Sequence, residues 1–175
     1  MLVEVKVQSL GLDRNTNTPV VILREQTGER VLPIWIGPGE ASAIAMHLAD
    51  WSFSRPLTHD LLVSLMGGLG GSLSRVIISR VVDNTYFAEL EVRRDEEVIS
   101  VDARPSDSIA IALRTGSSIF ADESLLESVT VEVAEDESVS MDLDSGEVSY
   151  LEEKGEDLKE YLRKLNPEDF GRFTP

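Results

Sequence analysis

The chain has 175 residues, 42% of them hydrophobic, which is typical of one main globular domain with a sizeable core. It contains no cysteine, and this excludes a disulfide framework, a thiolate nucleophile and a cysteine-based zinc site. Its formal net charge of −16 argues against a nucleic-acid enzyme, because phosphate binding normally shows itself as clustered lysine and arginine.

The acidic excess is spread unevenly along the chain. Residues 1–128 hold 18 acidic and 11 basic side chains, a net charge of −7, whereas residues 129–175 hold 14 acidic and 5 basic, a net charge of −9. Of the 16 basic residues 12 are arginine, whose planar guanidinium suits bidentate phosphate binding. Residues 1–128 should therefore repel a phosphate ligand less than the total charge of the chain implies.

Hydropathy along the chain predicts a cytoplasmic protein without a membrane partner. No run approaches the roughly 18 uninterrupted apolar residues that a membrane span needs. Residues 1–7 alternate charged and apolar side chains where a signal peptide has an unbroken apolar region.

The first third of the chain alternates like β-strands and then changes to a helical pattern. Three strands are predicted, over residues 2–9, 20–24 and 30–36. Turn-forming residues separate them, so an antiparallel meander is the simplest arrangement. Gly37-Pro38-Gly39 then breaks the strand, and residues 40–49 are rich in helix formers, with Glu40 near the positive end of the helix dipole.

The middle of the chain predicts a second helix followed by a second antiparallel set. Thr58 is the expected N-cap of this helix, and the glycine run 67–71 is expected to end it. A phosphate loop is not expected there, because a phosphate loop follows a strand and precedes a helix. Further strands are predicted over residues 73–82, 85–93 and 97–101. Asp83-Asn84 is a tight hairpin signal between the first two.

A third helix is bracketed by its end signals. Pro105 stands at the first helical position and Gly116 follows the last turn, so the helix is expected over residues 106–115, with a short strand over 117–121. The predicted fold class is α+β, with helices packed on a mostly antiparallel sheet or sheets.

The C-terminal part predicts a different organisation from the domain over residues 1–130. Residues 131–155 are acidic and poor in large apolar groups, which indicates a flexible linker. Within residues 156–175, apolar side chains recur at helical spacing at Leu158, Tyr161, Leu162 and Leu165. This amphipathic helix must bury its face on its own domain or on another subunit, so we expect a homo-oligomer, with a twofold dimer as the default.

Two short segments place polar side chains at predicted helix starts. They are residues 55–62, Arg-Pro-Leu-Thr-His-Asp-Leu-Leu, and residues 102–114, Asp-Ala-Arg-Pro-Ser-Asp-Ser-Ile-Ala-Ile-Ala-Leu-Arg. Together with residues 32–41 and 116–120, they resemble the motif set of the bifunctional nuclease domain family. Members of that family are associated with DNase and RNase activity. The resemblance implies a nuclease-like protein that hydrolyses phosphodiester bonds of DNA, RNA or both.

Phosphodiester hydrolysis needs an activated water, stabilisation of charge on the phosphoryl oxygens and help for the leaving oxygen. Nucleases obtain these from carboxylate-held Mg²⁺ or Mn²⁺, or from histidine, lysine and arginine without metal. The two segments contain carboxylates that could hold a metal, and also histidine and arginine that could act without one. The candidate catalytic residues are His59, Asp60, Asp102 and Asp107; of these Asp60, Asp102 and Asp107 are candidate ligands for Mg²⁺ or Mn²⁺. The candidate substrate-binding residues are Arg55, Arg104, Ser106 and Arg114.

Each candidate also has a structural interpretation. Asp60 and Asp107 lie where acidic residues stabilise a helix dipole, and an arginine–carboxylate pair can fix a loop without any catalysis. His59 is better placed for function than His47, which falls inside a predicted helix. The alternative function is therefore a non-enzymatic oligomeric binding or regulatory scaffold.

Two tryptophans are candidates for stacking on bases. Trp35 lies within an apolar strand and is expected in the core, whereas Trp51 stands beside Phe53 in a loop and is the better candidate for an exposed contact.

Overall fold

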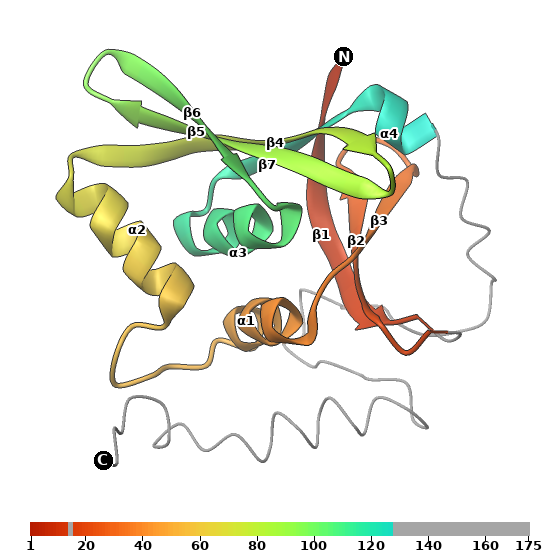
Figure 1. Ribbon diagram of the computed structural model, residues 1–175, viewed down its shortest axis with the longest axis horizontal. Helices are drawn as coiled ribbons and strands as arrows, with labels where there is room; N and C mark the ends of the chain where they lie inside the picture. Colours follow the sequence, from red (N-terminus) through yellow and green to blue (C-terminus); the bar gives the residue numbers. More distant parts are fainter. Residues whose placement is uncertain (14–15, 128–175) are drawn as a thin grey trace.

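A computed structural model describes residues 1–13 and 16–127, which form a seven-stranded sheet and four helices (Figure 1). The linker predicted over residues 131–155 and the amphipathic helix predicted within 156–175 lie outside the described residues.

The N-terminal strands form the predicted antiparallel meander. Its members are β1 (Leu2–Leu12), β2 (Pro19–Glu25) and β3 (Val31–Trp35). Alternate side chains of β2 are buried in the core, and Val21 and Leu23 of β2 and Leu32 of β3 are fully buried. Burial of each such aliphatic side chain stabilises the fold by about 2 kcal/mol. Trp35 was predicted in the core, and this is wrong: at the end of an edge strand it is half exposed and its indole N–H donates to Asp13.

The second antiparallel set is also as predicted. It consists of β4 (Gly71–Val82), β5 (Thr85–Arg94) and β6 (Glu97–Ala103). Asp83 and Asn84 join β4 to β5 with φ angles of 47° and 59°. Positive φ at both central residues is the requirement of a two-residue hairpin turn that matches the strand twist, and aspartate and asparagine accept it readily.

A seventh strand joins the two sets into one sheet. This is β7 (Ser118–Asp122), which lies between β1 and β4 in the strand order β3-β2-β1-β7-β4-β5-β6. It runs antiparallel to β1 but parallel to β4, so the sheet is mixed although mostly antiparallel. The α+β prediction is confirmed at this level.

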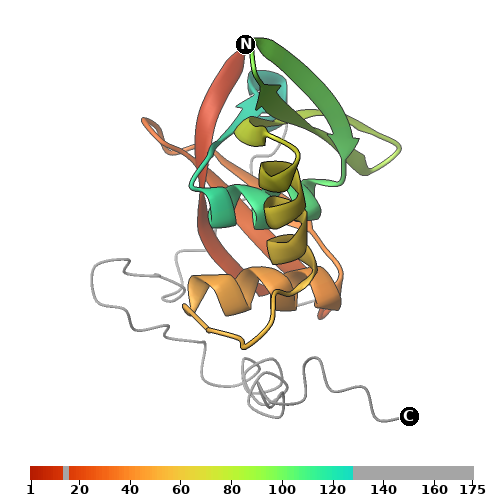
Figure 2. The ribbon, with the colours of Figure 1, turned by 90° about the vertical axis from the view of Figure 1, so that its left-hand side faces the viewer.

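Three helices lie on one side of the sheet (Figures 1 and 2). They are α1 (Pro38–Leu48), α2 (Thr58–Gly68) and α3 (Pro105–Thr115), and the shorter α4 (Glu123–Glu127) follows β7. Helix α3 lies next to the sheet, and both α1 and α2 pack against it. Its Ile109 and Ala110 are fully buried, so the core lies between α3 and the sheet.

Helix α3 has the predicted end signals. Pro105 occupies its first turn, and Gly116 closes it in the left-handed conformation with φ 67°, which glycine adopts at no steric cost. The predicted cap of α2 is wrong by one position. Thr58 is already helical, and the N-cap is Leu57, whose backbone N–H donates to the Asp60 carboxylate at 2.9 Å. A first-turn carboxylate thus satisfies the backbone N–H of the N-cap residue.

The helices of the described residues are all too short or too polar to cross a membrane.

Candidate active site

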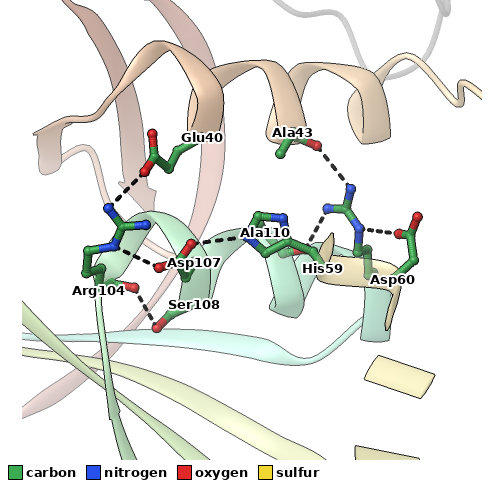
Figure 3. Close-up of polar contacts among 9 residues, drawn as sticks. Glu40, Ala43, His59, Asp60, Arg104, Asp107, Ser108 and Ala110 are labelled. Carbon is green, nitrogen blue, oxygen red and sulfur yellow. Dashed lines mark hydrogen bonds and ion pairs between the residues drawn. The ribbon is translucent and has the colours of Figure 1, made fainter. Parts of the chain in front are cut away.

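Three helix starts meet on the side of the sheet covered by α1, α2 and α3. Each of these helices carries an acidic residue in its first turn: Glu40 in α1, Asp60 in α2 and Asp107 in α3. A carboxylate there is stabilised by the positive end of the helix dipole. In this fold each of the three also contacts an arginine, so the acidic residues belong to two polar clusters (Figure 3).

The first cluster, which we call the histidine cluster, consists of Glu40, Arg104, Asp107 and His59. Arg104 precedes α3, and its Nε donates to Asp107 Oδ2 at 2.8 Å while its Nη1 contacts Glu40 Oε1 at 2.8 Å. The other oxygen of Asp107 lies 3.1 Å from His59 Nε2 on α2. A continuous row of polar contacts therefore links the first turns of α1, α3 and α2 (Figure 3).

The carboxylate at the centre of this row is held ionised. Burial raises the pKa of Asp107, but hydrogen bonds from Arg104 and His59 and the charge of Arg104 outweigh this, and the pKa lies below its ordinary value. An ionised carboxylate only accepts hydrogen bonds, so His59 Nε2 carries the proton and donates it to Asp107. In the neutral form of such an imidazole, the lone pair is on Nδ1.

The histidine cluster is open to solvent at one end. His59 is largely buried, yet its Nδ1 has no hydrogen-bond partner among the described residues. In the same part of the chain, every fully buried side-chain nitrogen or oxygen has such a partner. Nδ1 must therefore reach the surface. The Arg104 side chain is 66% exposed, and its Nη2 has no partner within the described part of the chain. A lone pair and two free N–H donors are available to a ligand.

The second cluster, which we call the Arg114 cluster, is closed. Arg114 is only 7% exposed in its side chain. Its Nε donates to Asp60 Oδ1 at 2.6 Å, Nη1 donates to the Ala110 carbonyl at 2.9 Å, and Nη2 donates to the Ala43 carbonyl at 3.2 Å. One guanidinium therefore ties the C-terminal half of α3 to α1 and to the start of α2 (Figure 3).

The electrostatics of Asp60 agree with a structural contact. Burial raises the pKa of Asp60. The hydrogen bonds from Arg114 and from the Leu57 N–H, together with the charges of Arg114 and His47, lower it by more, so the pKa lies below its ordinary value. Both carboxylate oxygens already accept hydrogen bonds from the protein. This arrangement fixes the N-terminus of α2, and Arg114, buried and with each of its three nitrogens donating to the protein, is poorly exposed to a substrate.

The remaining predicted site residues do not join either cluster. Arg55 is exposed in the loop before α2, and Asp102 is exposed on β6; neither has a hydrogen bond or ion pair with another described residue. Ser106 is buried in the first turn of α3, and its hydroxyl has no hydrogen-bond partner in the described part of the chain. The fold brings together His59, Arg104 and Asp107, and separately Asp60 and Arg114.

The three predicted metal ligands do not converge. Over residues 1–13 and 16–127, no group of three or more histidine, aspartate or glutamate side chains is placed to hold a metal ion. Asp60 and Asp107 each use both carboxylate oxygens on protein donors. The donor set of Asp60, Asp102 and Asp107 does not fit Mg²⁺ or Mn²⁺ in this arrangement.

Two residues of the site were not among those predicted. Glu40 was assigned only to the dipole of α1, although it also holds Arg104; a Cβ on Gly37 would collide with its carboxylate, so the glycine before α1 makes room for it. Ser108, fully buried, donates its hydroxyl to the Arg104 carbonyl at 2.9 Å. The Gly-Pro-Gly-Glu segment at residues 37–40 was the sequence signal for Glu40.

Comparison with known proteins agrees with this arrangement of motifs. The model of the bifunctional nuclease domain matches residues 21–134, and the chain belongs to that family. It is 39% identical over 167 residues to an uncharacterized protein of Mycobacterium tuberculosis, covering 95% of this chain and 97% of that protein.

Plant proteins of the family are more distant. Bifunctional nuclease 1 of Arabidopsis thaliana is 26% identical over 126 residues, 70% of this chain and 39% of that protein. Bifunctional nuclease 2 of Oryza sativa subsp. japonica is 27% identical over 111 residues, 61% of this chain and 34% of that protein. The chain thus spans little more than a third of the plant relatives.

Proposed function

We propose that this protein is a nuclease that hydrolyses phosphodiester bonds of DNA or RNA, and that the histidine cluster is its active site. The observation that supports this most is the His59–Asp107–Arg104 row. It combines an imidazole oriented by an ionised carboxylate with an exposed guanidinium that has free donors. The names of the plant relatives and the shared domain supply the substrate class.

In the proposed reaction His59 acts as the general base. Its Nδ1 takes a proton from a water molecule while the water oxygen forms a bond to phosphorus, and the bond from phosphorus to the leaving nucleotide oxygen breaks. The leaving oxygen takes that proton from His59, or it takes one from solvent while His59 releases its own to solvent. Either way the protonation state of the enzyme is restored. General acid–base catalysis of this kind contributes about 10²- to 10⁴-fold in rate.

Arg104 stabilises the negative charge that develops on the phosphoryl oxygens. Its Nε and Nη1 are held by Asp107 and Glu40, so the guanidinium is fixed in orientation while Nη2 faces the substrate. Ser106 and the backbone N–H groups of the first turn of α3 are a second set of donors for the same phosphate. Arg55, exposed before α2, is proposed to contact a neighbouring phosphate.

The test is cleavage of labelled single- and double-stranded DNA and RNA by the purified full chain, with Mg²⁺, Mn²⁺ or EDTA, beside Asp107→Asn purified identically. Cleavage by the wild type that is lost in the folded variant is expected. Equal cleavage by both preparations points to a contaminant and contradicts the proposed site. Retention of wild-type cleavage in EDTA separates histidine chemistry from a metal-dependent reaction.

A second candidate function is a non-enzymatic oligomeric scaffold. It is favoured by a specific observation, the exposed leucines on α2, of which Leu65 is 55% exposed, and Leu69 just after it, 67% exposed. Under this alternative the polar clusters only hold the helix starts together. Replacement of His59 would then lower stability or change assembly, and no cleavage would follow the wild-type protein.

A further inference from the structure

The histidine cluster has one base and no spare carboxylate. Asp107 accepts from His59 through Oδ1 and from Arg104 through Oδ2, and Glu40 contacts Arg104 through Oε1. Both carboxylates of the cluster are thus engaged with a cation. The imidazole nitrogen Nδ1 is left as the group that takes a proton from a nucleophile.

A water nucleophile needs more than a base. It must lie in line with the leaving oxygen, and a metal ion or a second acceptor is the usual means of holding it there. Over residues 1–13 and 16–127, no group of three or more histidine, aspartate or glutamate side chains is placed to hold a metal ion. The cluster is therefore equipped to deprotonate a nucleophile but poorly equipped to position a water molecule.

The same cluster has several donors that suit a phosphate. Ser106 lies in the first turn of α3, directly before Asp107, and is only 6% exposed. Its hydroxyl has no hydrogen-bond partner in the part of the chain that the structure describes, where every fully buried side-chain oxygen has one, so this hydroxyl reaches the surface. Arg104 Nη2 and the backbone N–H groups of the first turn are further donors at this helix start. Under the proposed function, these groups hold the phosphodiester beside the imidazole.

RNA carries a nucleophile that needs no separate positioning. The ribose 2′-hydroxyl is attached next to the carbon that bears the 3′ phosphate, so donors that fix the phosphate also restrict the hydroxyl. Reacting groups held together in this way reach effective molarities of about 10⁵ to 10⁸ M. DNA lacks this hydroxyl, which is the group that distinguishes the two nucleic acids.

We propose, resting on the nuclease function above, that the histidine cluster cleaves RNA by attack of the ribose 2′-hydroxyl on the adjacent phosphorus. His59 Nδ1 takes the proton of that hydroxyl while the 2′ oxygen forms a bond to phosphorus. The bond from phosphorus to the 5′ oxygen of the next nucleotide breaks. That oxygen takes a proton from solvent, and His59 releases its own proton to solvent. The products are a 2′,3′-cyclic phosphate and a 5′-hydroxyl.

This route makes RNA the preferred substrate class and determines the product ends. DNA is cleaved only by the slower attack of water. Opening of the cyclic phosphate also requires a water nucleophile, which the cluster positions poorly. Cyclic phosphate ends should therefore accumulate during the reaction.

Replacement of a single sugar tests the nucleophile. The full chain is assayed in EDTA on a labelled single-stranded RNA, with one ribose at a cleaved position replaced by 2′-deoxyribose or by 2′-O-methylribose. Cleavage on the 3′ side of the replaced sugar should fall about 100-fold or more, because the attacking hydroxyl is lost. Cleavage at neighbouring positions of the same strand is the internal control and should continue. Mass spectrometry should show 3′ ends with one water less than an opened phosphate.

Two variants attribute the cleavage to the protein. Asp107→Asn, purified identically, should lose cleavage at every position of the RNA. Asp95→Asn makes the same chemical change in the exposed turn between β5 and β6, and it should keep wild-type cleavage and cyclic product ends.

The outcomes separate this proposal from the proposed function. Cleavage that is lost in Asp107→Asn but is equal at ribose, 2′-deoxyribose and 2′-O-methylribose would overturn the 2′-hydroxyl route and leave the nuclease function standing. Opened phosphate ends at the earliest time points, or cleavage only with added Mg²⁺ or Mn²⁺, would do the same. No cleavage by the wild type under any of these conditions, or equal cleavage by Asp107→Asn, would overturn both.

Discussion

The two polar clusters of this fold use the same residue types but differ in how much of each arginine remains free. Arg104 in the histidine cluster is 66% exposed and keeps one nitrogen without a partner in the described residues, whereas Arg114 is 7% exposed and donates from all three nitrogens. A buried guanidinium whose three nitrogens all donate to the protein fixes structure, and an exposed one can bind a ligand. The sequence motifs contain both kinds of arginine, and only the contacts in the structure distinguish the two.

The acidic residues of the two clusters differ in the same way as the arginines. Asp107 orients an imidazole whose second nitrogen reaches the surface, while Asp60 caps α2 and pairs with Arg114. We therefore propose that the histidine cluster carries the chemistry and that the Arg114 cluster carries stability. Substitutions in the two clusters should therefore differ in their effects on cleavage and on stability.

The largest effect is expected for activity on replacement of His59. His59→Gln keeps a polar side chain of similar size but removes the general base, so cleavage should fall about 10³-fold. Unfolding free energy should fall by about 1 to 2 kcal/mol, since one hydrogen bond to the ionised Asp107 changes while its ion pair with Arg104 remains. Initial cleavage rates and urea unfolding of the same preparations measure both. His47→Gln in α1 is the matched control and should keep full activity.

The next largest effect is expected for stability on replacement of Arg114. Arg114→Met keeps much of the side-chain volume but leaves Asp60 without its partner and two carbonyls without their donors, so the unfolding free energy should fall by about 3 kcal/mol. Chemical denaturation measures this. Arg55→Met, at an exposed residue without a partner in the described chain, is the control and should change it by less than about 0.5 kcal/mol. Equal destabilisation by the two substitutions would contradict the structural assignment.

A smaller effect is expected on the pH dependence of stability. The pKa of Asp60 is lowered in the folded state, so its contribution is present above the unfolded value near pH 4 and is lost as the pH falls through the folded value. Asp60→Asn should therefore be less stable than the wild type by about 1 kcal/mol at pH 7, discounted for partial exposure. The gap should narrow at pH 3. Urea midpoints across this range measure it, and a constant gap would show that the ionised pair contributes nothing.

The smallest effect is expected at Asp102. It is exposed on β6 and has no partner among the described residues, so Asp102→Asn should change the unfolding free energy by less than about 0.5 kcal/mol. Cleavage should change less than threefold. A loss of cleavage comparable to that of His59→Gln would extend the proposed active site to β6. It would contradict the proposal that the histidine cluster alone carries the chemistry.

The boundaries of local structure were readable from the sequence. Pro105 and Gly116 enclose α3, and Asp83-Asn84 makes the hairpin, because proline, glycine and asparagine restrict or permit particular backbone angles on their own. The position of β7 between β1 and β4 was not readable, because it depends on pairing between distant strands. The fold class was predicted, and the single mixed sheet was not.

For the site, residue types were predicted better than their grouping. His59, Arg104 and Asp107 were candidates from two separate motifs, and contact across the α2–α3 interface unites them. Glu40 was missed since its role depends on Arg104 in another motif. The spacing of residues in a sequence shows which side chains share a face of one helix. Which polar side chain is left to bind a ligand depends on its exposure and on its contacts with other helices.

The most direct test of the central claim is to measure cleavage of one labelled RNA and one labelled DNA by wild type, His59→Gln and Arg114→Lys, at a temperature where circular dichroism shows all three folded. We expect loss of cleavage in His59→Gln and near-normal cleavage in Arg114→Lys, despite its lower melting temperature. Loss of cleavage in folded Arg114→Lys with normal activity in His59→Gln would contradict it.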